Sequence, residues 1–399
     1  MNTLLERQSI MLQSTSMSIV RDFMNHVNWK APMLCIRGAR GVGKSTLLRQ
    51  YMKLNYQDHP EDVLYCSLDW SYFSQNTIID VAERLHQKGS KLLILDEVHK
   101  YRNWSKEVKE IAEIYPDIQI IMSGSSLLNL MTGDADLSRR CRNYNMPGLS
   151  YREFLLFYKR IYIPTFTLEE ILNNAHAIAN EINSKCRPLQ FFSDYLKYGY
   201  YPFYLNNPTD YYVLLEQTEN YVIDVELTQL KGVVPANTRK LKALLNVIAQ
   251  LVPFDVDISK LSSVTELQRN TVIEYLNHLH DAKLINLLYS DYISVKKMQK
   301  PDKIYLENPN LLYAFATNPV KIGTARECFA VNQLLHSHLV EYGKEEGDIK
   351  VDGKWTFEIG GERKSFAQIA DIPDSFVFAD NIEYPQGNKL PLWMLGFLY

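Results

Sequence analysis

A glycine-rich stretch, GARGVGKS at residues 38–45, constrains this chain more than any other part of its sequence. It fits the pattern G-x-x-x-x-G-K-[ST] at every fixed position. Glycines let a backbone wrap closely around phosphate groups, and the N–H groups of such a loop point inward. The strand-like run Met33–Arg37 precedes the loop and the helical stretch Ser45–Leu54 follows it, as this chemistry requires. The stretch therefore predicts a phosphate-binding loop between a strand and a helix.

The expected ligands of this loop are ATP and Mg²⁺, and different residues of the loop are expected to contact each of them. Lys44 is expected to reach the β- and γ-phosphate oxygens, and the Ser45 hydroxyl to bind Mg²⁺. The set predicted to contact the nucleotide is Gly38, Ala39, Arg40, Gly41, Val42, Gly43, Lys44, Ser45 and Thr46.

Two adjacent carboxylates follow an apolar run at Lys91–Leu95. We expect this run to be a strand beside the phosphate-loop strand, with Asp96 at its tip binding Mg²⁺. Glu97 is expected to deprotonate the attacking water, which hydrolysis needs and simple nucleotide carriage does not. His99 comes shortly after the pair and is interpreted as a surface histidine rather than a second sensor.

The next apolar run, Ile118–Met122, ends in SGSS. Ser123 is the candidate sensor of the γ-phosphate, and the alternative is an ordinary turn. The arginines of residues 134–142 follow, and one of them could reach a γ-phosphate in its own chain or in a neighbour's, where a placed arginine is worth about 10³–10⁵ in rate. The alternative is a basic surface turn.

Short apolar runs alternate with helical stretches over the first part of the chain, for example Val63–Leu68 followed by Thr77–Gln87. This alternation predicts an α/β fold, with a mostly parallel sheet covered by helices on both faces. The expected organisation is a P-loop core at 1–149, a helical lid or connector at 150–236, a winged-helix-like region at 237–300 and a small α/β domain at 301–399.

Composition limits the class of protein. The 43 Lys and Arg against 46 Asp and Glu give a formal net charge of −3, which excludes a chain that holds nucleic acid by bulk charge. No apolar run approaches the roughly 20 residues of a membrane span, and residues 1–20 lack the apolar stretch of a signal peptide. The five cysteines are widely spaced, so we expect neither a disulfide framework nor a zinc site. We therefore expect the chain to be located in the reducing cytoplasm.

The region predicted as a winged helix has one apolar helical face at Val272, Leu276 and Leu279. Its polar positions, which DNA would contact, are Gln268, Arg269, Asn270 and Asn277, followed by a basic stretch at Lys296, Lys297, Lys300 and Lys303. The alternative is a protein-contact or interdomain module with a solvated face. DNA and a second copy of the chain stay open as partners, and a membrane is not expected.

The segments GARGVGKSTLL, LLILDE, SGSS and DLSRRCRNYNMPGLSYREFL together resemble a family of prokaryotic AAA-type ATPases that carry a C-terminal domain of the PD-(D/E)xK nuclease fold. The resemblance places the arginine finger on Arg140, with Arg139 where the family has glycine. It also matches Tyr195–Pro202 to the family pattern Y-L-x-x-G-G-x-P, with Tyr200 replacing the second glycine. It implies ATP hydrolysis coupled to movement of the C-terminal region.

The tail is similar to a D…E-x-K metal-nuclease constellation at Asp348, Glu358 and Lys364. A nuclease of this kind has lysine where this chain has Gly360. Lys364 can take the place of that lysine only if the Gly360–Gly361 turn brings its side chain back to Glu358. Glu327 is a further candidate carboxylate. We expect a degenerate, non-cleaving domain. The alternatives to an ATPase are a nucleotide-gated DNA-binding or regulatory switch with slow hydrolysis, and an ATP-dependent nuclease.

Overall fold

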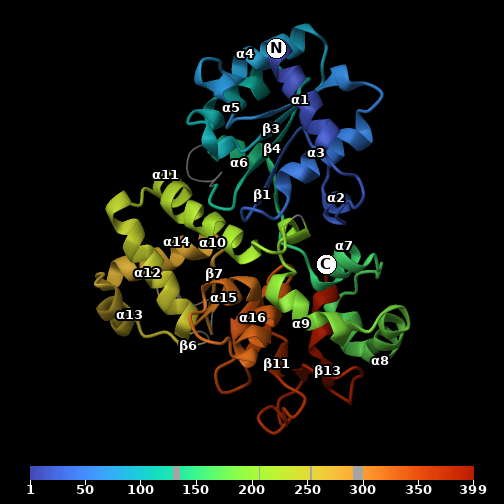
Figure 1. Cartoon of the computed structure of the whole chain (residues 1–399), viewed down its shortest axis with the longest axis vertical. Helices are drawn as coiled ribbons and strands as arrows, with labels where there is room; N and C mark the ends of the chain where they lie inside the picture. Colours follow the sequence, from blue (N-terminus) through green and yellow to red (C-terminus); the bar gives the residue numbers. More distant parts are fainter. Residues whose placement is uncertain (129–134, 206, 252–253, 291–299) are drawn as a thin grey trace. The chain divides into compact units, whose positions relative to one another are not determined.

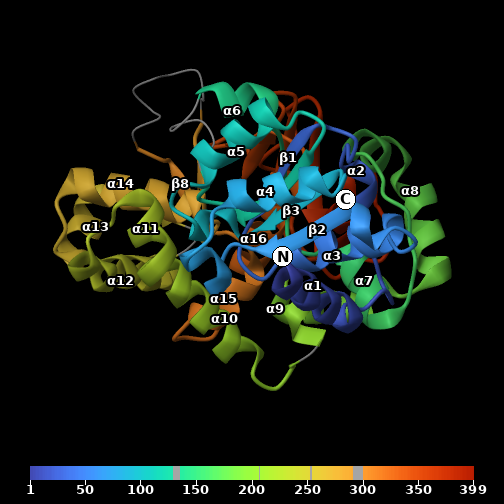
Figure 2. The same ribbon diagram turned by 90° about the horizontal axis from the view of Figure 1, so that it is seen from above.

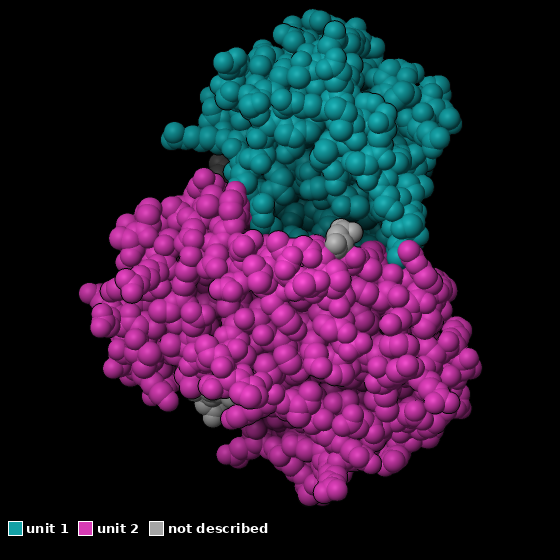
Figure 3. Space-filling view, viewed as in Figure 1, with its two compact units in different colours: residues 1–147 teal, residues 148–399 magenta. Residues whose placement is uncertain are grey.

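The computed structural model of the chain describes residues 1–128, 135–205, 207–251, 254–290 and 300–399 (Figure 1). It consists of two compact units, Met1–Pro147 and Gly148–Tyr399, which Figure 3 colours separately. This division falls close to the predicted end of the P-loop core at residue 149. The three regions predicted after residue 149 lie within the second unit, and their separation from one another stays a prediction.

A five-stranded sheet forms the centre of the first unit, in the order β2-β3-β4-β1-β5 with every pair parallel. Its strands are β1 (Met33–Gly38), β2 (Val63–Ser67), β3 (Leu92–Asp96), β4 (Gln119–Ser125) and β5 (Arg142–Asn145). β2 and β3 are buried at every position, as expected for parallel strands covered on both faces. The predicted α/β fold is confirmed.

The predicted neighbour of the phosphate-loop strand is wrong. We expected the strand before the acidic pair to lie beside β1, but β4 lies between β3 and β1. Leu95 of β3 is in register with Met122 of β4, which in turn is in register with Cys35 of β1. The apolar run of β4 is buried on both sides, and it places the predicted sensor Ser123 between the loop strand and the acidic strand.

Helices cover both faces of this sheet. Figure 2 shows α4 and α5 on one face and α1 and α3 on the other. The helices of the first unit are α1 (Asn2–Ser14), α2 (Phe23–His26), α3 (Lys44–Asn55), α4 (Ile78–Gln87), α5 (Trp104–Ile114) and α6 (Ala135–Arg140), with short turns η1 (Pro60–Asp62), η2 (Ser71–Ser74) and η3 (Val98–Lys100). Thr77 begins α4 with a reciprocal capping box to Asp80, which satisfies backbone N–H groups at the helix start.

The second unit begins with the predicted helical region. Its elements are α7 (Tyr151–Lys159), α8 (Leu168–Lys185), α9 (Pro188–Tyr198), η4 (Pro202–Leu205), α10 (Tyr211–Tyr221), the π-turn η5 (Val222–Glu226) and α11 (Leu227–Lys231). Proline at the start of α9 and of η4 accounts for the breaks between helices. Tyr201 is fully buried and Tyr198 stacks on Tyr204, so these tyrosines pack within the unit.

Three helices and a small sheet follow, with the element order of a winged helix. They are α12 (Pro235–Leu251), α13 (Ile258–Thr265), α14 (Arg269–Asp281), β6 (Phe254–Asp255), β7 (Ile285–Leu288) and β8 (Lys303–Leu306). β8 pairs antiparallel with both β6 and β7. β8 lies beyond the boundary expected at residue 300, and this boundary and the winged helix stay predictions.

The chain ends in a second five-stranded sheet, of mixed direction and in the order β13-β12-β11-β10-β9. Its elements are α15 (Pro309–Phe315), α16 (Ile322–Leu334), β9 (Val340–Tyr342), β10 (Ile349–Val351), β11 (Trp355–Gly360), β12 (Ser375–Ala379), β13 (Lys389–Pro391) and η7 (Leu392–Phe397). β10 and β11 form an antiparallel pair. The apolar end of the chain is the buried turn η7, in which Trp393 is fully buried.

A buried carboxylate, Glu307, joins several parts of the second unit. Its Oε1 accepts hydrogen bonds from Tyr200 Oη at 2.9 Å and Asn332 Nδ2 at 3.1 Å, and its Oε2 accepts one from Asn308 Nδ2 at 2.7 Å. Burial raises the pKa of Glu307 above its ordinary value. Tyr200, which stands where the similar family has glycine, therefore has a structural hydrogen bond.

Among the residues that the structure describes, no helix combines the length and the apolar character needed to cross a bilayer.

Candidate functional site

The phosphate loop connects the end of β1 to the start of α3, as predicted. Gly41 and Gly43 have φ angles of 86° and 101°, in the left-handed region that favours glycine. A Cβ at Gly38 would lie 2.4 Å from the Met146 carbonyl oxygen, so only glycine fits there. Backbone geometry thus accounts for glycine at all three of these positions, of which Gly38 and Gly43 are fixed in the pattern.

Lys44, in the first turn of α3, is buried and folds back over the loop. Its Nζ donates to the carbonyl oxygens of Gly38 at 3.0 Å and Ala39 at 2.9 Å. Val42 is fully buried beneath the loop, whereas Thr46 is exposed. Arg40 and Ser45, the remaining predicted contacts, are half-buried on the same segment.

Asp96 ends β3 and is held by side chains from both neighbouring strands. Tyr65 of β2 donates its hydroxyl to Asp96 Oδ2 at 2.5 Å, and the Ser123 hydroxyl of β4 donates to Asp96 Oδ1. Burial and the adjacent Asp96 carboxylate raise the pKa of Tyr65, which keeps its phenol protonated and a donor. Tyr65 was not identified from the sequence, since its only signal is its place on a strand next to β3.

Glu97 follows with a left-handed backbone, at φ 57°, which is uncommon for a residue other than glycine. Its N–H donates to Ser123 Oγ at 3.1 Å. Ser123 itself is fully buried, and its hydroxyl contacts both members of the acidic pair. The structure therefore places Ser123 as a support for Asp96 and Glu97, and its predicted contact with a γ-phosphate stays a prediction.

The interpretation of His99 as a surface residue is wrong. It lies in η3, and its side chain is 1% exposed. The Ser125 N–H donates to its Nδ1 at 3.3 Å, and its Nε2 lies 3.3 Å from Glu97 Oε2. A polar turn after the acidic pair gave no sign that this side chain would be buried.

Arg140, the predicted finger, ends α6 on the surface of the first unit. Its Nη2 lies 3.6 Å from Glu113 Oε1 of α5, and the two side chains are 44% and 48% exposed. An ion pair so exposed contributes little to stability. The role of Arg140 at a phosphate, in its own chain or a neighbour's, stays a prediction.

Arg21, just before α2, is a further residue at this site that the sequence analysis missed. It is buried, and its Nη1 donates to the carbonyl oxygens of Val42 at 3.2 Å and Pro147 at 2.8 Å. It therefore fixes the phosphate loop to the last residue of the first unit. A lone arginine far from the motif in sequence carries no pattern that indicates such a contact.

In the second unit, Lys364 does fold back onto Glu358. Its Nζ contacts Glu358 Oε1 directly, and the turn that returns it is closed by the Lys364 N–H donating to Gly361 O at 2.9 Å. Burial raises the pKa of Glu358, while Lys364 opposes that rise. Asp348 Oδ2 accepts the Ile359 N–H at 2.7 Å.

Glu327 of α16 belongs to the same cluster of charges. Its Oε2 accepts a hydrogen bond from Tyr305 Oη at 2.9 Å and lies 3.6 Å from Lys303 Nζ. Within the described ranges, no three His, Cys, Asp or Glu side chains are grouped as they would be around a metal ion. Here the carboxylates are matched by lysines.

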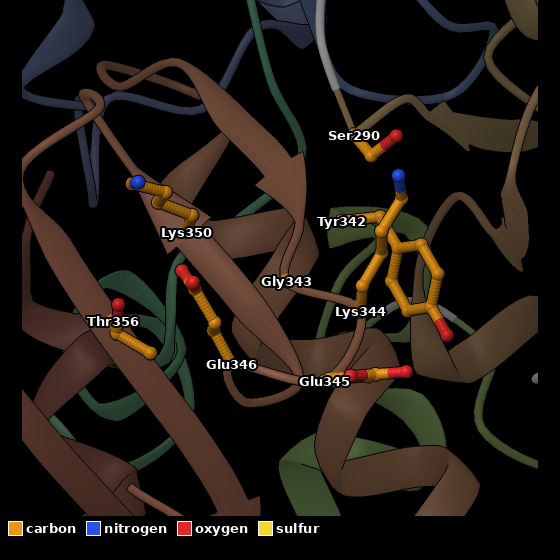
Figure 4. Close-up of a pocket in the computed structure, with 8 residues that line it drawn as sticks. All are labelled: Ser290, Tyr342, Gly343, Lys344, Glu345, Glu346, Lys350 and Thr356. Carbon is orange, nitrogen blue, oxygen red and sulfur yellow. The ribbon is translucent and has the colours of Figure 1, made fainter. Parts of the chain in front are cut away.

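A polar pocket of about 610 Å³ lies beside this cluster, around the loop between β9 and β10. Figure 4 shows Lys344 pointing toward Ser290, whereas the ammonium group of Lys350 points away from the Glu346 carboxylate. Because both signs of charge line the pocket, its chemistry indicates neither an anion nor a cation.

Helix α14 of the second unit has the predicted apolar and polar faces. Val272, Leu276 and Leu279 of α14 are fully buried. The polar positions proposed for DNA contact are exposed, namely Gln268, Arg269, Asn270 and Asn277. In the basic stretch that follows, Lys296 and Lys297 lie outside the described residues.

A glycine loop between the first strand and its helix, with a carboxylate ending another parallel strand of the same sheet, defines a P-loop NTPase fold. Residues 30–155 match the model of the AAA domain family, and this segment includes the loop, the acidic pair, Ser123 and Arg140. The first unit thus has a P-loop NTPase fold, and most of it matches the AAA domain family.

Residues 189–321 match a domain of unknown function, DUF8612. This match runs from α9 to the start of α16, across the boundaries expected at 236 and 300.

Among full-length relatives, an uncharacterized protein of Methanocaldococcus jannaschii is 27% identical over 293 residues. The aligned region covers 69% of this chain and 61% of the length of that relative.

Two solved structures show a likeness to this one. The Walker-type ATPase of Pyrococcus abyssi has a TM-score of 0.39 and 12% identity, over 73% of this chain and 93% of its own. The DnaA protein of Aquifex aeolicus, bound to AMPPCP, has a TM-score of 0.28 and 15% identity, over 66% of this chain and 86% of its own. The assignment of the first unit rests on the loop, the acidic pair and the family model.

Proposed function

We propose that the first unit binds ATP with Mg²⁺ and hydrolyses it to ADP and phosphate. The observation that carries this proposal is Lys44, whose buried ammonium group is held inside the glycine loop by two carbonyl oxygens at 2.9–3.0 Å. A phosphate oxygen is a stronger acceptor for an ammonium group than a carbonyl. The loop therefore holds a cation ready for an anionic ligand.

The donor set fits Mg²⁺, since a serine hydroxyl and a carboxylate are hard oxygen ligands and this ion completes its shell with water and phosphate oxygens. Ser45 and Asp96 would hold the ion. When bound, it neutralises charge that develops on the transferred phosphoryl group. Tyr65 and Ser123 hold Asp96 in place by donating hydrogen bonds to it.

Glu97 is the proposed general base. It accepts a proton from water while the water oxygen forms a bond to the γ-phosphorus, and the bond from that phosphorus to the β–γ bridging oxygen breaks. ADP and inorganic phosphate leave. Arg140 is proposed to stabilise the γ-phosphate charge, and nucleotide state to move the winged-helix and nuclease-like regions.

The test is ATPase activity as a function of protein concentration, with and without DNA. We expect Mg²⁺-dependent release of phosphate, and a steep concentration dependence would support an Arg140 supplied by a neighbouring copy. Hydrolysis at the wild-type rate in a Lys44→Ala variant would remove this site from the mechanism.

A nucleotide-gated DNA-binding switch is a second candidate, favoured by the exposed polar positions of α14. Its output would be partner binding rather than turnover. Tight ATP binding, hydrolysis barely above background and little stimulation by DNA would favour the switch over the ATPase.

An ATP-dependent nuclease is the third candidate, and the contact of Lys364 with Glu358 favours it. We expect plasmid DNA to stay intact with Mg²⁺ or Mn²⁺, because Gly360 stands where a nuclease has lysine. Cutting that disappears in Glu358→Ala would instead establish a nuclease centre.

A further inference from the structure

His99 is a buried histidine directly beside the proposed general base. Its side chain is 1% exposed, whereas that of Glu97 is 24% exposed. The two are joined by the short turn η3, and the imidazole Nε2 lies 3.3 Å from Glu97 Oε2. A histidine buried to this extent next to a catalytic carboxylate has few orientations open to it.

The other ring nitrogen assigns the tautomer. Nδ1 accepts the Ser125 backbone N–H at 3.3 Å. A backbone N–H can only donate, so Nδ1 carries no proton and the proton of the neutral ring is on Nε2. This nitrogen lies 3.3 Å from Glu97 Oε2.

The anchor of the imidazole belongs to the strand next to the phosphate loop. Ser125 ends β4 and is in register with Gly38, the first residue of the loop, on β1. Ser123, two residues earlier on β4, accepts the Glu97 N–H at 3.1 Å. The end of β4 therefore holds both the backbone of Glu97 and the imidazole ring of His99.

We propose that His99 is a positioning residue for the general base. Its Nε2–H fixes Glu97 Oε2, which leaves Oε1 to accept the proton of the attacking water. This inference rests on the proposed ATP hydrolysis. A misplacement of a catalytic group by about 1 Å costs on the order of a hundredfold in rate. Glu97 also has a left-handed backbone, which is uncommon for a residue other than glycine, so a contact that holds its side chain helps to keep the carboxylate in place.

The experiment compares His99→Phe with His99→Gln in steady-state ATP hydrolysis. Phenylalanine fills a similar volume without a donor, whereas glutamine keeps an N–H donor. We expect His99→Phe to lower kcat by about 10- to 100-fold, with KM and the Kd for a non-hydrolysable ATP analogue changed less than about threefold. His99→Gln should keep most of the wild-type kcat.

A wild-type kcat in His99→Phe, or equal losses of kcat in both variants, would overturn the positioning role. Analogue binding reports whether each variant is folded. In a Glu97→Gln background, adding His99→Phe should cause no further loss of kcat, because the carboxylate that it positions is gone; a further tenfold loss would contradict the proposal. Absence of hydrolysis in the wild type would contradict the proposed function, whereas hydrolysis that needs Glu97 and not His99 would contradict this inference alone.

Discussion

The two units hold their carboxylates in opposite ways. In the first unit, the Asp96 carboxylate receives hydrogen bonds from two hydroxyl groups, and the Glu97 carboxylate lies beside a histidine. In the second, Glu358 and Glu327 lie against lysine ammonium groups. Neutral donors orient a carboxylate without cancelling its charge, whereas a lysine cancels it. The first arrangement suits a site that takes up a cation, and the second suits an internal ionic link.

The largest effect is expected when Lys44 of the first unit is replaced, and replacement of Lys364 of the second unit provides the comparison. Lys44→Met should lower ATP hydrolysis by at least about a hundredfold, since a placed charge at a transferring phosphoryl group is worth that much or more. Lys364→Met, in the second unit, should leave hydrolysis unchanged at a temperature where the variant is folded. Phosphate release measured on both proteins checks this, and a large loss in Lys364→Met would contradict the assignment of the charges.

Glu97→Gln should lower kcat by about 10²–10⁴, the range of a general base, while ATP still binds. The matched variant is Glu358→Gln, which should not change kcat. The measurement is single-turnover hydrolysis together with analogue binding. Normal hydrolysis by Glu97→Gln would show that another group accepts the proton.

Removal of the lysine from the second cluster should affect stability rather than activity. In Lys364→Met the buried Glu358 carboxylate loses the ammonium group beside it, so we expect the free energy of unfolding to fall by about 1–3 kcal/mol. The loss should be at the low end of this range because the Lys364 side chain is 34% exposed to solvent. Without Lys364 the pKa of Glu358 lies further above its ordinary 4.5. The loss should therefore be small below pH 4.5 and grow as pH rises through the folded-state value. Urea unfolding across this range tests the prediction, and a pH-independent loss would refute it.

Glu307 sharpens the comparison, because this carboxylate of the second unit has neutral donors like those of the first. Its raised folded-state pKa means that its contribution to stability is fully present below pH 4.5 and is lost as pH rises through the folded value. The stability of the wild type relative to Glu307→Gln should fall over this window, by about 1 kcal/mol. Denaturant unfolding at several pH values provides the measurement; a difference that rises with pH would mean that the donors outweigh burial.

Local spacing was sufficient to predict the phosphate loop, its flanking strand and helix, and the acidic end of β3. These features depend on residues close together in sequence. The order of strands does not, since β4 pairs with both β1 and β3 through contacts between distant apolar runs of similar composition. The same limit explains why Tyr65 and Arg21 were missed.

Burial was the second kind of information that the sequence did not supply. His99, in the turn after β3, and Ser123, near the end of β4, are polar residues, and both are buried. The return of Lys364 to Glu358 depends on the turn after Gly360, whose geometry the residue pattern left open. The apolar and polar positions of α14, in contrast, followed directly from helical period.

The contact of Arg21 with Pro147 has a practical consequence for dividing the molecule. Both units are contiguous, so the backbone passes from one to the other once, at Pro147–Gly148. A truncated first unit that ends before Pro147 would leave a buried guanidinium group short of an acceptor, directly against Val42 of the phosphate loop. Separate expression of the two halves should therefore keep Pro147 with the nucleotide-binding half.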